Sequence, residues 1–570
     1  MTNRKRDLII SLVLILISIM LLLPFALRGK SKPFQDNKTV IDAEPSIYSV
    51  ALLSFGNIAK KFHTEVQLDW DQNKDPKEII YGNKDFGYFS LKDFSLTNKL
   101  SFSILPFTFE KAINFCIKYQ DGTIKKGISK KFNDPQFSFL KNIRIKKEGK
   151  FSQNFFLMSA QFVPEAASHK DRSYLPVIVN RNGEIIWAHL PNNGKTLFQK
   201  YPTIKPLGNG DYGIIFGEKY SYFERFNILG KVKEQIFPKM AVDPYVIHHD
   251  FIYLGQSKIL TLGHKVHYVR NLFSFTDKSL ERVPILSRPK SFLSTTVELV
   301  DISTNKNKTM WDPISLINPL EGVPWSRNKE HAERVLQSPG RHFTLWGKER
   351  AKIDWTHANS IEHYPGVGIL VSMRNMSQVV LLDENSFDVI WTLGNRANDT
   401  YQTLNEKHAF YHQHHVQLLE NGYILMLDNH TSPPAPKNIG SRVSIYGVNQ
   451  QTGKAQIVWN YQPQNKIHIG NRGSAYMLEN KNVLAFYPVS VGLTDNLIEI
   501  ERKTGQPVAH LKIYFTDVKR NFSDRQLKQL KQKKMAPLRH IREGGGNRVV
   551  PIHVLGKEKR VPAISCGGLP

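Results

Sequence analysis

The segment Val177-Ile-Val-Asn-Arg-Asn-Gly-Glu-Ile-Ile-Trp187 decides how most of the chain folds. Two apolar runs flank a polar turn that contains Asn-Gly, a pattern typical of two antiparallel strands joined by a tight turn. Related units, each an apolar strand followed by a polar turn and a second strand, recur along the chain. They contain Phe226, Val297, Val379, Val443 and Leu497. The sequence from about residue 174 onward is therefore repetitive, with six strand-rich units.

Six such units predict a β-propeller. One four-stranded blade leaves both faces of its sheet uncovered, so neighbouring blades stack radially around a channel. We therefore expect an all-β fold whose main part is a six-bladed β-propeller at residues 166–520. The distances between the terminal tryptophans are irregular, which implies insertions, and the largest of these covers about 313–352.

The segments that flank the repeats differ from them in composition. Residues 35–165 contain short apolar runs separated by polar turns, which predict a small β-sandwich-like domain. Residues 521–570 form a basic C-terminal tail. A capped basic helix is predicted to begin there at Ser523. The simplest explanation of its basic residues is that the helix is exposed to solvent.

Residues 1–34 predict a membrane anchor. The 20 residues Leu8 to Leu27 are apolar except for Ser11, Ser18 and Pro24, and as a helix they span a bilayer core of about 30 Å. This run is longer than the apolar part of a signal peptide, so we expect an uncleaved single-pass signal-anchor. A short cytoplasmic N-terminus then places the rest of the chain on the extracytoplasmic, periplasmic face of the inner membrane.

Charge and cysteine content narrow the choice of partners. The 570 residues include 77 Lys and Arg against 50 Asp and Glu, a net charge of +27, which favours anionic partners such as acidic substrates or lipid headgroups. A solvated basic surface explains the same charge equally well. Cys116 and Cys566 are the only cysteines, which excludes a cysteine-ligated zinc site and a disulfide scaffold. The two pair only if the fold brings the tail back.

Histidines and one arginine recur near the starts of successive units. They are His248-His249, His357, Arg374 and His414-His415. The first strand of each propeller blade lines the axial channel, so these side chains are expected to converge on one pocket. Several imidazoles and a guanidinium suit an oxyanion, because Arg is a forked donor and His can donate, accept or attack. The pattern predicts a site for phosphate or sulfate esters, although any one of these histidines alone is also typical of an ordinary core residue.

Other kinds of site find less support. His408 and His412 lie four residues apart and imidazole is a common metal ligand, so a metal-dependent phosphoesterase remains a competing interpretation. No His-Glu-x-x-His sequence and no carboxylate in a recognised ligand spacing accompany them, and we expect no metal and no cofactor. No Gly-x-Ser-x-Gly sequence supports a serine nucleophile. A nucleophile is therefore expected to be a histidine.

Two blocks resemble the bacterial arylsulfate sulfotransferase family. Asp354-Trp-Thr-His-Ala-Asn-Ser-Ile361 and Ile369-Leu-Val-Ser-Met-Arg374 resemble the family's Asp-Trp-x-His-x-Asn-Ser and Ser-x-Arg segments. Gln413-His414, with Leu427-Asp428-Asn429 further on, is similar to the segment that holds the histidine which becomes transiently sulfurylated. The resemblance covers about residues 174–515. It implies a six-bladed propeller that moves a sulfuryl group between phenols without a nucleotide donor.

The resemblance also implies roles for particular residues. His414 is the expected nucleophile, and His249, His357 and Arg374 are the other expected catalytic residues, with His248 a one-residue alternative to His249. A threonine of the family aligns with Gly473, so its contribution is lost or replaced here. The residues expected to bind substrate are Asn359, His248, His415 and Ser474.

The sequence thus predicts an aryl sulfotransferase with a ping-pong mechanism through a sulfohistidine. Its expected partners are an aryl sulfate donor, a phenolic acceptor and the membrane, with no nucleic acid, and homodimerisation is left open. The alternative is a non-catalytic propeller that binds sulfated or acidic glycans with its basic face.

Overall fold

The structure is a computed structural model in which the chain divides into two units, Met1–Ile47 and Tyr48–Pro570. All described residues belong to the second unit. They are residues 64–68, 73–83, 87–91, 95–96, 100–104, 114–128, 143–162, 173–188, 202–208, 211–216, 222–227, 232–236, 247–269, 290–315, 353–354, 356–396, 398–430, 440–464, 467–488, 494–515 and 548–552.

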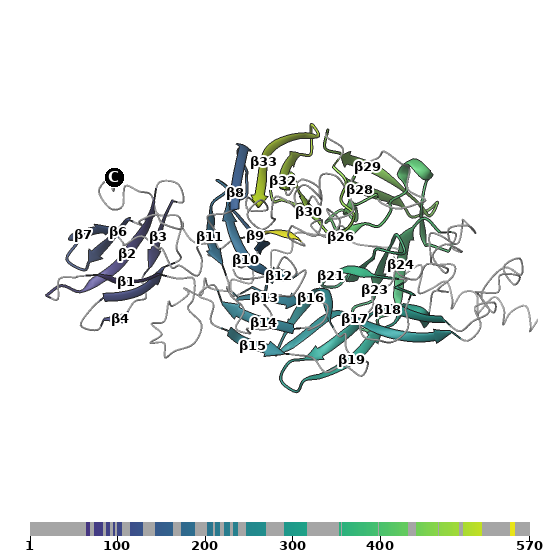
Figure 1. The fold of residues 1–570 in the computed structure, drawn as a ribbon, viewed down its shortest axis with the longest axis horizontal. Helices are drawn as coiled ribbons and strands as arrows, with labels where there is room; N and C mark the ends of the chain where they lie inside the picture. The colour runs from purple at the N-terminus through teal and green to yellow at the C-terminus, as the bar shows by residue number, and fades with distance from the viewer. Residues whose placement is uncertain are drawn as a thin grey trace, which may run out of the picture. The chain divides into compact units, whose positions relative to one another are not determined.

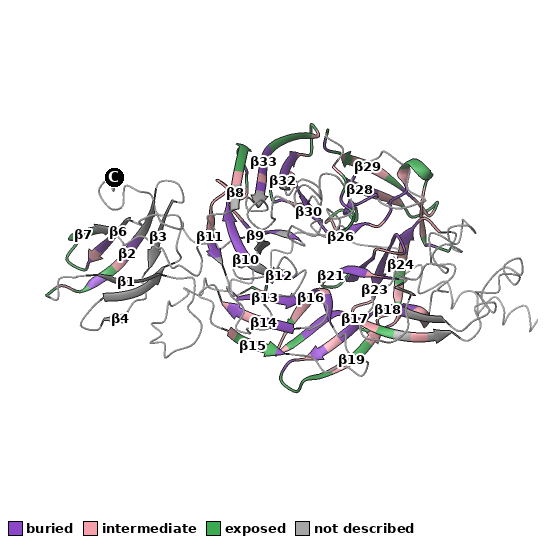
Figure 2. Ribbon diagram, viewed as in Figure 1, coloured by how far each residue is buried: buried purple, intermediate pink, exposed green. Residues whose placement is uncertain are grey.

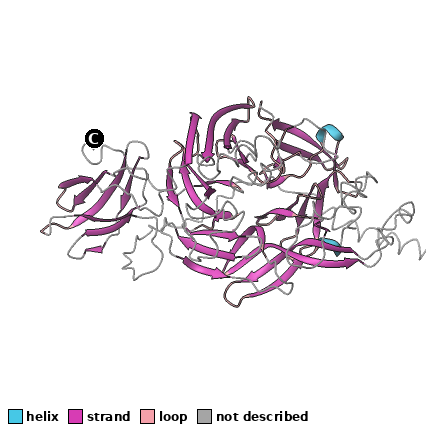
Figure 3. Cartoon of the chain, in the orientation of Figure 1, coloured by secondary structure: helices cyan, strands magenta, loops and turns pink. Residues whose placement is uncertain are grey.

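The described residues are almost all strand or turn, as the sequence predicts (Figure 3). The helical elements among them are two single turns of 3₁₀-helix, η5 (Pro313–Ser315) and η8 (Glu406–His408). Within these ranges no helix is long and apolar enough to cross a membrane. Residues 8–27, 316–352 and 516–547, which carry the predicted anchor, most of the predicted insertion and the predicted basic helix, lie outside the described ranges.

Two small antiparallel sheets occupy the described part of residues 64–128. The first has the order β1-β5-β4, and the second has the order β3-β2-β6-β7. Their strands are β1 (Thr64–Leu68), β2 (Pro76–Asn83), β3 (Gly87–Leu91), β4 (Ser95–Leu96), β5 (Leu100–Ile104), β6 (Asn114–Tyr119) and β7 (Ile124–Ile128). Cys116, on β6, is buried and disulfide-bonded, and Cys566 is the chain's only other cysteine.

The hairpin predicted at residues 177–187 is confirmed as β10 (Ser173–Asn180) and β11 (Ile185–Ala188), which pair antiparallel. The Asn180 side chain closes the turn, because its Oδ1 accepts hydrogen bonds from the backbone N–H groups of Asn182 and Glu184, each 2.9 Å long. The sheet continues from β10 to β9 (Phe155–Phe162) and then to β34 (Val549–Ile552). Its fourth strand therefore comes from the C-terminal segment (Figure 1).

Three more antiparallel groups contain strands that follow one another along the chain, as the repeat predicts (Figure 1). The first contains β12 (Thr203–Pro206), β13 (Asp211–Phe216), β14 (Tyr222–Asn227) and β15 (Val232–Ile236). The second contains β16 (His248–Gly255), β17 (Lys258–Val269), β18 (Lys290–Asp301) and β19 (Lys306–Trp311), with β20 (Ile353–Asp354) parallel to β18. The third contains β30 (Ser474–Met477), β31 (Val483–Pro488), β32 (Thr494–Glu501) and β33 (Gln506–Phe515), and β8 (Ile143–Gly149) pairs with β33.

A nine-stranded sheet joins two further groups through a short parallel strand, β25 (Tyr401–Thr403). On one side of it lie β21 (Ala358–Tyr364), β22 (Gly368–Met373), β23 (Gln378–Leu382) and β24 (Val389–Gly394). On the other side lie β26 (His414–Leu418), β27 (Ile424–Asp428), β28 (Arg442–Asn449) and β29 (Lys454–Tyr461).

Burial explains why these groups need one another (Figure 2). The second strands β13, β22, β27 and β31 are buried at every residue, so both faces of their sheets are covered. The fourth strands β15 and β29 alternate between exposed and less exposed residues, as the outer edge of a sheet does. Apolar clusters fill the space between successive groups; one of them packs Leu370 and Leu381 against Val416 and Met426.

The first strands of the groups lie at sheet edges and contact one another. β16 and β26 both contact β21, and β26 also contacts β30. β34 contacts β30 on one side and β12 on the other. A strand from residues 548–552 therefore lies between the last group and the β12 group. The sequence contains no repeat signal at this place, where we expected only a basic tail.

Packing of β34 predicts a large effect of Val550→Asp. Val550 is 7% exposed and pairs with Leu157 of β9, so a carboxylate there loses its hydration. We expect the free energy of unfolding to fall by about 3 kcal/mol or more, measured by urea denaturation. Val508→Asp is the matched control because Val508, on β33, is 38% exposed, and its effect should stay within about 0.5 kcal/mol. Equal, small losses for both variants would contradict the packing of β34.

Candidate functional site

Most of the predicted site residues lie in or next to the edge strands, and Arg374 follows the second strand of its group. His248 and His249 begin β16, His414 and His415 begin β26, and Ser474 begins β30. His357 directly precedes β21, which contains Asn359, and Arg374 directly follows β22. Because these edge strands contact one another, residues far apart in sequence share one region of the fold.

The backbone is strained at three of the histidines. His249, His357 and His415 have φ angles of 59°, 46° and 58°, in the left-handed region that residues other than glycine rarely adopt. The pairing register shifts beside His248 and His414, where β-bulges begin their strands. A bulge redirects the side chains around it, and strain of this kind costs about 1–3 kcal/mol per residue. Left-handed residues and bulges at several strand starts thus set the direction of these side chains.

The structure separates the roles of the neighbouring histidines His248 and His249. The ring of His249 meets that of His357 edge to face, with centroids 4.9 Å apart. His248 stacks on His264, a residue absent from the predicted site, at 3.9 Å. Its Nδ1 lies 2.6 Å from the Nδ1 of His249. His249 is therefore the member that reaches the predicted catalytic group, and His248 lies behind it.

Burial and neighbouring imidazoles keep His249 neutral. Burial is the main cause that holds its pKa well below the usual range, and His248, His357 and His414 act in the same direction. The rings of His249 and His357, from different groups, are in contact, and β26, which begins with His414, contacts β21, which begins directly after His357. That His414 joins these two rings in one pocket stays a prediction.

His414 is buried, and one hydrogen bond fixes its tautomer. Its Nδ1 lies 2.9 Å from the carbonyl oxygen of Gly473. A carbonyl only accepts, so Nδ1 carries the proton and Nε2 has the free lone pair. Burial, then the charge of Arg548, hold the pKa of His414 well below the usual value, while the bond to Gly473 opposes them. The imidazole is therefore neutral, with Nε2 available as a nucleophile.

Position 473, whose carbonyl accepts from His414, accommodates only glycine. Its φ is +92°, and an added Cβ would lie 2.2 Å from Leu427 Cδ2 and 2.7 Å from the Phe486 carbonyl oxygen. The threonine found in the family does not fit this backbone. The chain instead uses the main-chain carbonyl of Gly473 to orient His414, and the buried Ser474 follows it at the start of β30.

Arg374 and Asn359 hold the elements around His414. Arg374 donates to the carbonyl of Gly470 at 2.8 Å and to the side chain of Asn375 at 2.7 Å. Its charge lowers the pKa of His414, though less than burial does. Asn359 is fully buried and its Nδ2 donates to the carbonyl of Gln413 at 2.8 Å, which links β21 to the residue before His414.

His415 belongs to a different set of contacts from His414. Its Nε2 lies 3.7 Å from Glu362 Oε1, and its ring lies 4.3 Å from that of Tyr476. Burial, then the charge of Arg548, lowers the pKa of His415 to about 4, although Glu362 opposes this. His415 therefore joins a buried polar network that also contains Lys205, Asp250 and Arg548, none of which the sequence indicated.

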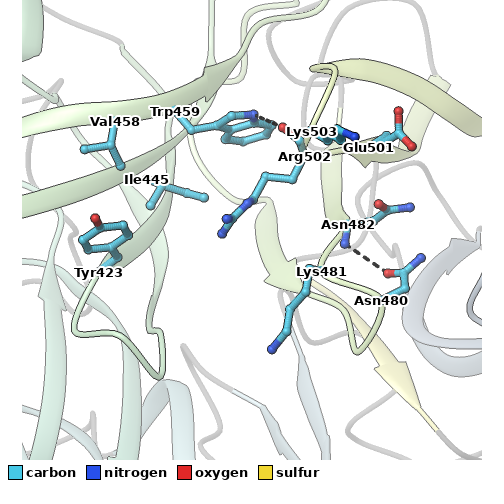
Figure 4. Close-up of a pocket in the computed structure, with 10 residues that line it drawn as sticks. All are labelled: Tyr423, Ile445, Val458, Trp459, Asn480, Lys481, Asn482, Glu501, Arg502 and Lys503. Atoms are coloured by element: carbon cyan, nitrogen blue, oxygen red, sulfur yellow. Dashed lines mark hydrogen bonds between the residues drawn. The ribbon is translucent and has the colours of Figure 1, made fainter. Parts of the chain in front are cut away.

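A cavity of about 520 Å³ lies between strands β28 and β29 and the turns that join β30 to β31 and β32 to β33 (Figure 4). It combines aromatic and basic side chains, and the indole N–H of Trp459 donates to the Arg502 carbonyl at 2.9 Å. The lining residues are Tyr423, Ile445, Val458, Trp459, Asn480, Lys481, Asn482, Glu501, Arg502 and Lys503. None of the predicted site residues lines it. Among the described residues, no group of three or more His, Cys, Asp or Glu side chains is arranged to hold a metal ion.

Comparison with known proteins gives one family. Residues 141–522 match the family model described as Arylsulfotransferase (ASST). No curated protein sequence matches the chain.

Solved structures give only remote similarities. A protein of unknown function from Bacteroides caccae is 10% identical, with 70% of this chain and 96% of that chain covered and a TM-score of 0.30. A putative 6-phosphogluconolactonase from Bacteroides uniformis is 10% identical, with coverage of 77% and 100% and a TM-score of 0.30. An oligogalacturonate lyase from Vibrio parahaemolyticus is 8% identical, with coverage of 64% and 84% and a TM-score of 0.29. Similarities this low carry no argument about function.

The geometry at Gly473 predicts a destabilising Gly473→Ala substitution. Gly422→Ala is the matched control, because Gly422 also has a positive φ, +77°, but an added Cβ there meets nothing within 4 Å. We expect Gly422→Ala to cost about 1 kcal/mol through backbone strain alone. Gly473→Ala should cost about 1–3 kcal/mol more, because Leu427 and the strand must move. Chemical denaturation of both variants measures the difference, and equal losses would disprove the close packing at Gly473.

Proposed function

The chain belongs to the arylsulfotransferase (ASST) family, and on that premise we propose that it transfers a sulfuryl group from a phenolic sulfate ester to a phenolic acceptor. Family membership supports a sulfotransferase enzyme in general. The observation that carries the more specific proposal is the buried, neutral His414, whose Nδ1–H is held by the Gly473 carbonyl. That arrangement leaves Nε2 unprotonated, as a nucleophile requires.

In the first half-reaction, Nε2 of His414 attacks the sulfur of the aryl sulfate. The N–S bond forms as the bond from sulfur to the aryl oxygen breaks, and the electron pair leaves on that oxygen, which takes up a proton to give the phenol. The ring of the sulfohistidine carries a positive charge, and the Gly473 carbonyl that accepts the Nδ1–H stabilises it. In the second half-reaction an acceptor phenol attacks sulfur, gives up its proton, and returns the electron pair to Nε2. The reaction is thus ping-pong and needs no nucleotide donor.

The other side chains divide the remaining work. Arg374 is a fixed cation, and its hydrogen bonds to Gly470 and Asn375 hold its guanidinium for the sulfuryl oxygens. One preorganised donor of this kind supplies about 3 kcal/mol of transition-state stabilisation. The proposal assigns transfer of the phenolic proton to His249 and His357, and their ring contact supports a shared role. Asn359, His248, His415 and Ser474 support these groups or the bound substrates.

The proposal extends to the fold and the compartment. The strands described from β8 onward contain six groups of four, besides the added strands β8, β20 and β25, which supports a six-bladed propeller. The disulfide at Cys116 supports an oxidising, extracytoplasmic location, because cytosolic thiols stay reduced. The anchor at residues 1–34, the β domain at 35–165, the propeller at 166–520 and the tail at 521–570 complete the proposed organisation, although β8 and β9 lie before residue 166 and pair with later strands.

Binding of acidic glycans is the second candidate function, and the cavity beside Trp459 favours it. An aromatic side chain together with Lys481, Arg502 and Lys503 suits an anionic sugar. Tight glycan binding by a protein that turns over no aryl sulfate would favour this alternative.

Exposure to an aryl sulfate should sulfurylate His414. We expect an adduct of about 80 Da on the peptide that contains His414, seen by mass spectrometry after rapid quenching and digestion. His414→Ala should lose the adduct, the release of phenol and the transfer to an added phenol. His468→Ala is the control, since His468 is exposed, and it should retain all three. Transfer by His414→Ala at the wild-type rate would reject the assignment.

The first half-reaction should stay fast at mildly acidic pH. Neutral His414 is the reactive form, and its pKa is held well below the usual value of about 6.5, so protonation slows the reaction only below that value. We expect single-turnover phenol release to be constant from pH 7 to about 6 and to fall at lower pH. The unfolded chain binds more protons than the folded one in the same window, so stability also falls as pH falls, and circular dichroism must confirm folding at each pH. A midpoint at or above 6.5 would contradict a neutral buried nucleophile.

A further inference from the structure

A network of buried and half-buried ionic and polar side chains has one member on or directly beside each of six edge strands. Its two cations are Lys205 and Arg548, and its two anions are Asp250 and Glu362. The members, in strand order, are Lys205 on β12, Asp250 on β16, Glu362 on β21, His415 on β26, Tyr476 on β30 and Arg548 beside β34.

Arg548 is at the centre of this network and is 2% exposed. Its Nη1 lies 3.0 Å from Asp250 Oδ2 and 3.7 Å from Glu362 Oε1. Its Nη2 donates to the main-chain carbonyl of Asn359 at 3.2 Å. Lys205 Nζ lies 2.9 Å from both Asp250 and Glu362, so the four charges balance. Burying an arginine costs several kcal/mol unless anions compensate it, and here they do.

The partners of Arg548 adjoin the predicted catalytic residues. Asp250 follows His249 in the chain. Asn359 lies two residues after His357 and donates to the carbonyl of Gln413, the residue before His414. Glu362 reaches His415, the residue after His414. One guanidinium from the C-terminal segment thus contacts β16 through Asp250 and β21 through Glu362 and Asn359, and Glu362 in turn lies near His415 of β26.

We propose that Arg548 is a positioning residue for sulfuryl transfer, whose forked guanidinium fixes β16 and β21 directly and, through Glu362 and His415, the start of β26 that carries His414. The inference rests on the proposed function, since it assigns Arg548 a part in that same site. The C-terminal strand then completes the active site as well as the fold.

The positive charge of Arg548 also affects the pKa of His414. After burial, Arg548 is the strongest influence that lowers the pKa of His414, and Arg374 and His415 act in the same direction. The Gly473 carbonyl opposes them, and His249 is a further titratable group within electrostatic reach. A neutral side chain at position 548 should therefore let His414 accept a proton at higher pH, whereas lysine should preserve the charge and lose the fork.

Arg548→Gln and Arg548→Lys test the two effects separately. For Arg548→Gln we expect kcat to fall about 10-fold or more with KM changed less than about 3-fold. The acid limb of the pH profile should move up by about half a pH unit or more. Arg548→Lys should lower kcat but keep the wild-type acid limb. The control is Arg442→Gln, which removes another buried arginine from its ion pair with Asp428 and should lower stability without moving that limb.

Histidine NMR of ¹³C-labelled protein supplies a readout that needs no turnover. The His414 resonance, assigned with His414→Gln, should titrate at higher pH in Arg548→Gln than in wild type. A folded Arg548→Gln variant with wild-type kcat and an unchanged His414 titration would overturn the proposal. If that variant does not fold, Arg548→Lys decides, and a wild-type kcat there overturns it. A wild-type protein that transfers no sulfuryl group would reject the proposed function, while the NMR titration would still judge the effect of Arg548 on His414.

Discussion

The ion pair between Arg548 and Asp250, 3.0 Å long and buried on both sides, connects the closure of the fold to its chemistry. Each four-stranded group buries both faces of its sheet only because neighbours cover it, so no group is stable alone. The C-terminal strand β34 lies between β30 and β12, and Arg548 secures it there. The second oxygen of Asp250 pairs with Lys205 of β12, and Asp250 also accepts from the N–H of Ile361 in β21. One carboxylate therefore links three other strands.

The strained backbone of the site depends on the packing of these neighbouring groups. Left-handed conformations at His249, His357 and His415 are unfavourable in isolated strands, so packing of the surrounding sheets must hold them. Cross-strand hydrogen bonds do this locally: Asn359 binds the carbonyl of Gln413, and Ser360 accepts from the N–H of Val416 at 3.3 Å. Packing in the apolar clusters between the groups offsets the free energy of this backbone strain. Side-chain direction at the edge strands is thereby fixed before any substrate binds.

Much of this arrangement follows from the sequence because the repeat is local. The hairpin at 177–187 is encoded by its own turn, and the repeat is enough to predict the contact between His249 and His357. β34 is different, since its four residues include Pro551 and its partner β9 lies far away in the chain. Charged residues such as Lys205 and Glu362 look like solvated surface until their neighbours are known. Gly473 orients His414 through its main-chain carbonyl, a group that every residue has, so the sequence does not indicate this role.

The proposed reaction needs both a neutral nucleophile and a cation for the substrate in one basic site. A buried histidine with cations nearby has a lowered pKa and is neutral, as a nucleophile must be. Such a neutral histidine cannot stabilise the negative charge of the sulfuryl oxygens as a cation would. Division of labour between two arginines resolves this. Arg548 is held between Asp250 and Glu362 and lowers the pKa of His414, while Arg374 donates to the Gly470 carbonyl and to the Asn375 side chain. Hydrogen bonds of this kind fix the direction of a guanidinium, so in the proposed mechanism Arg374 is the cation oriented toward the sulfuryl oxygens.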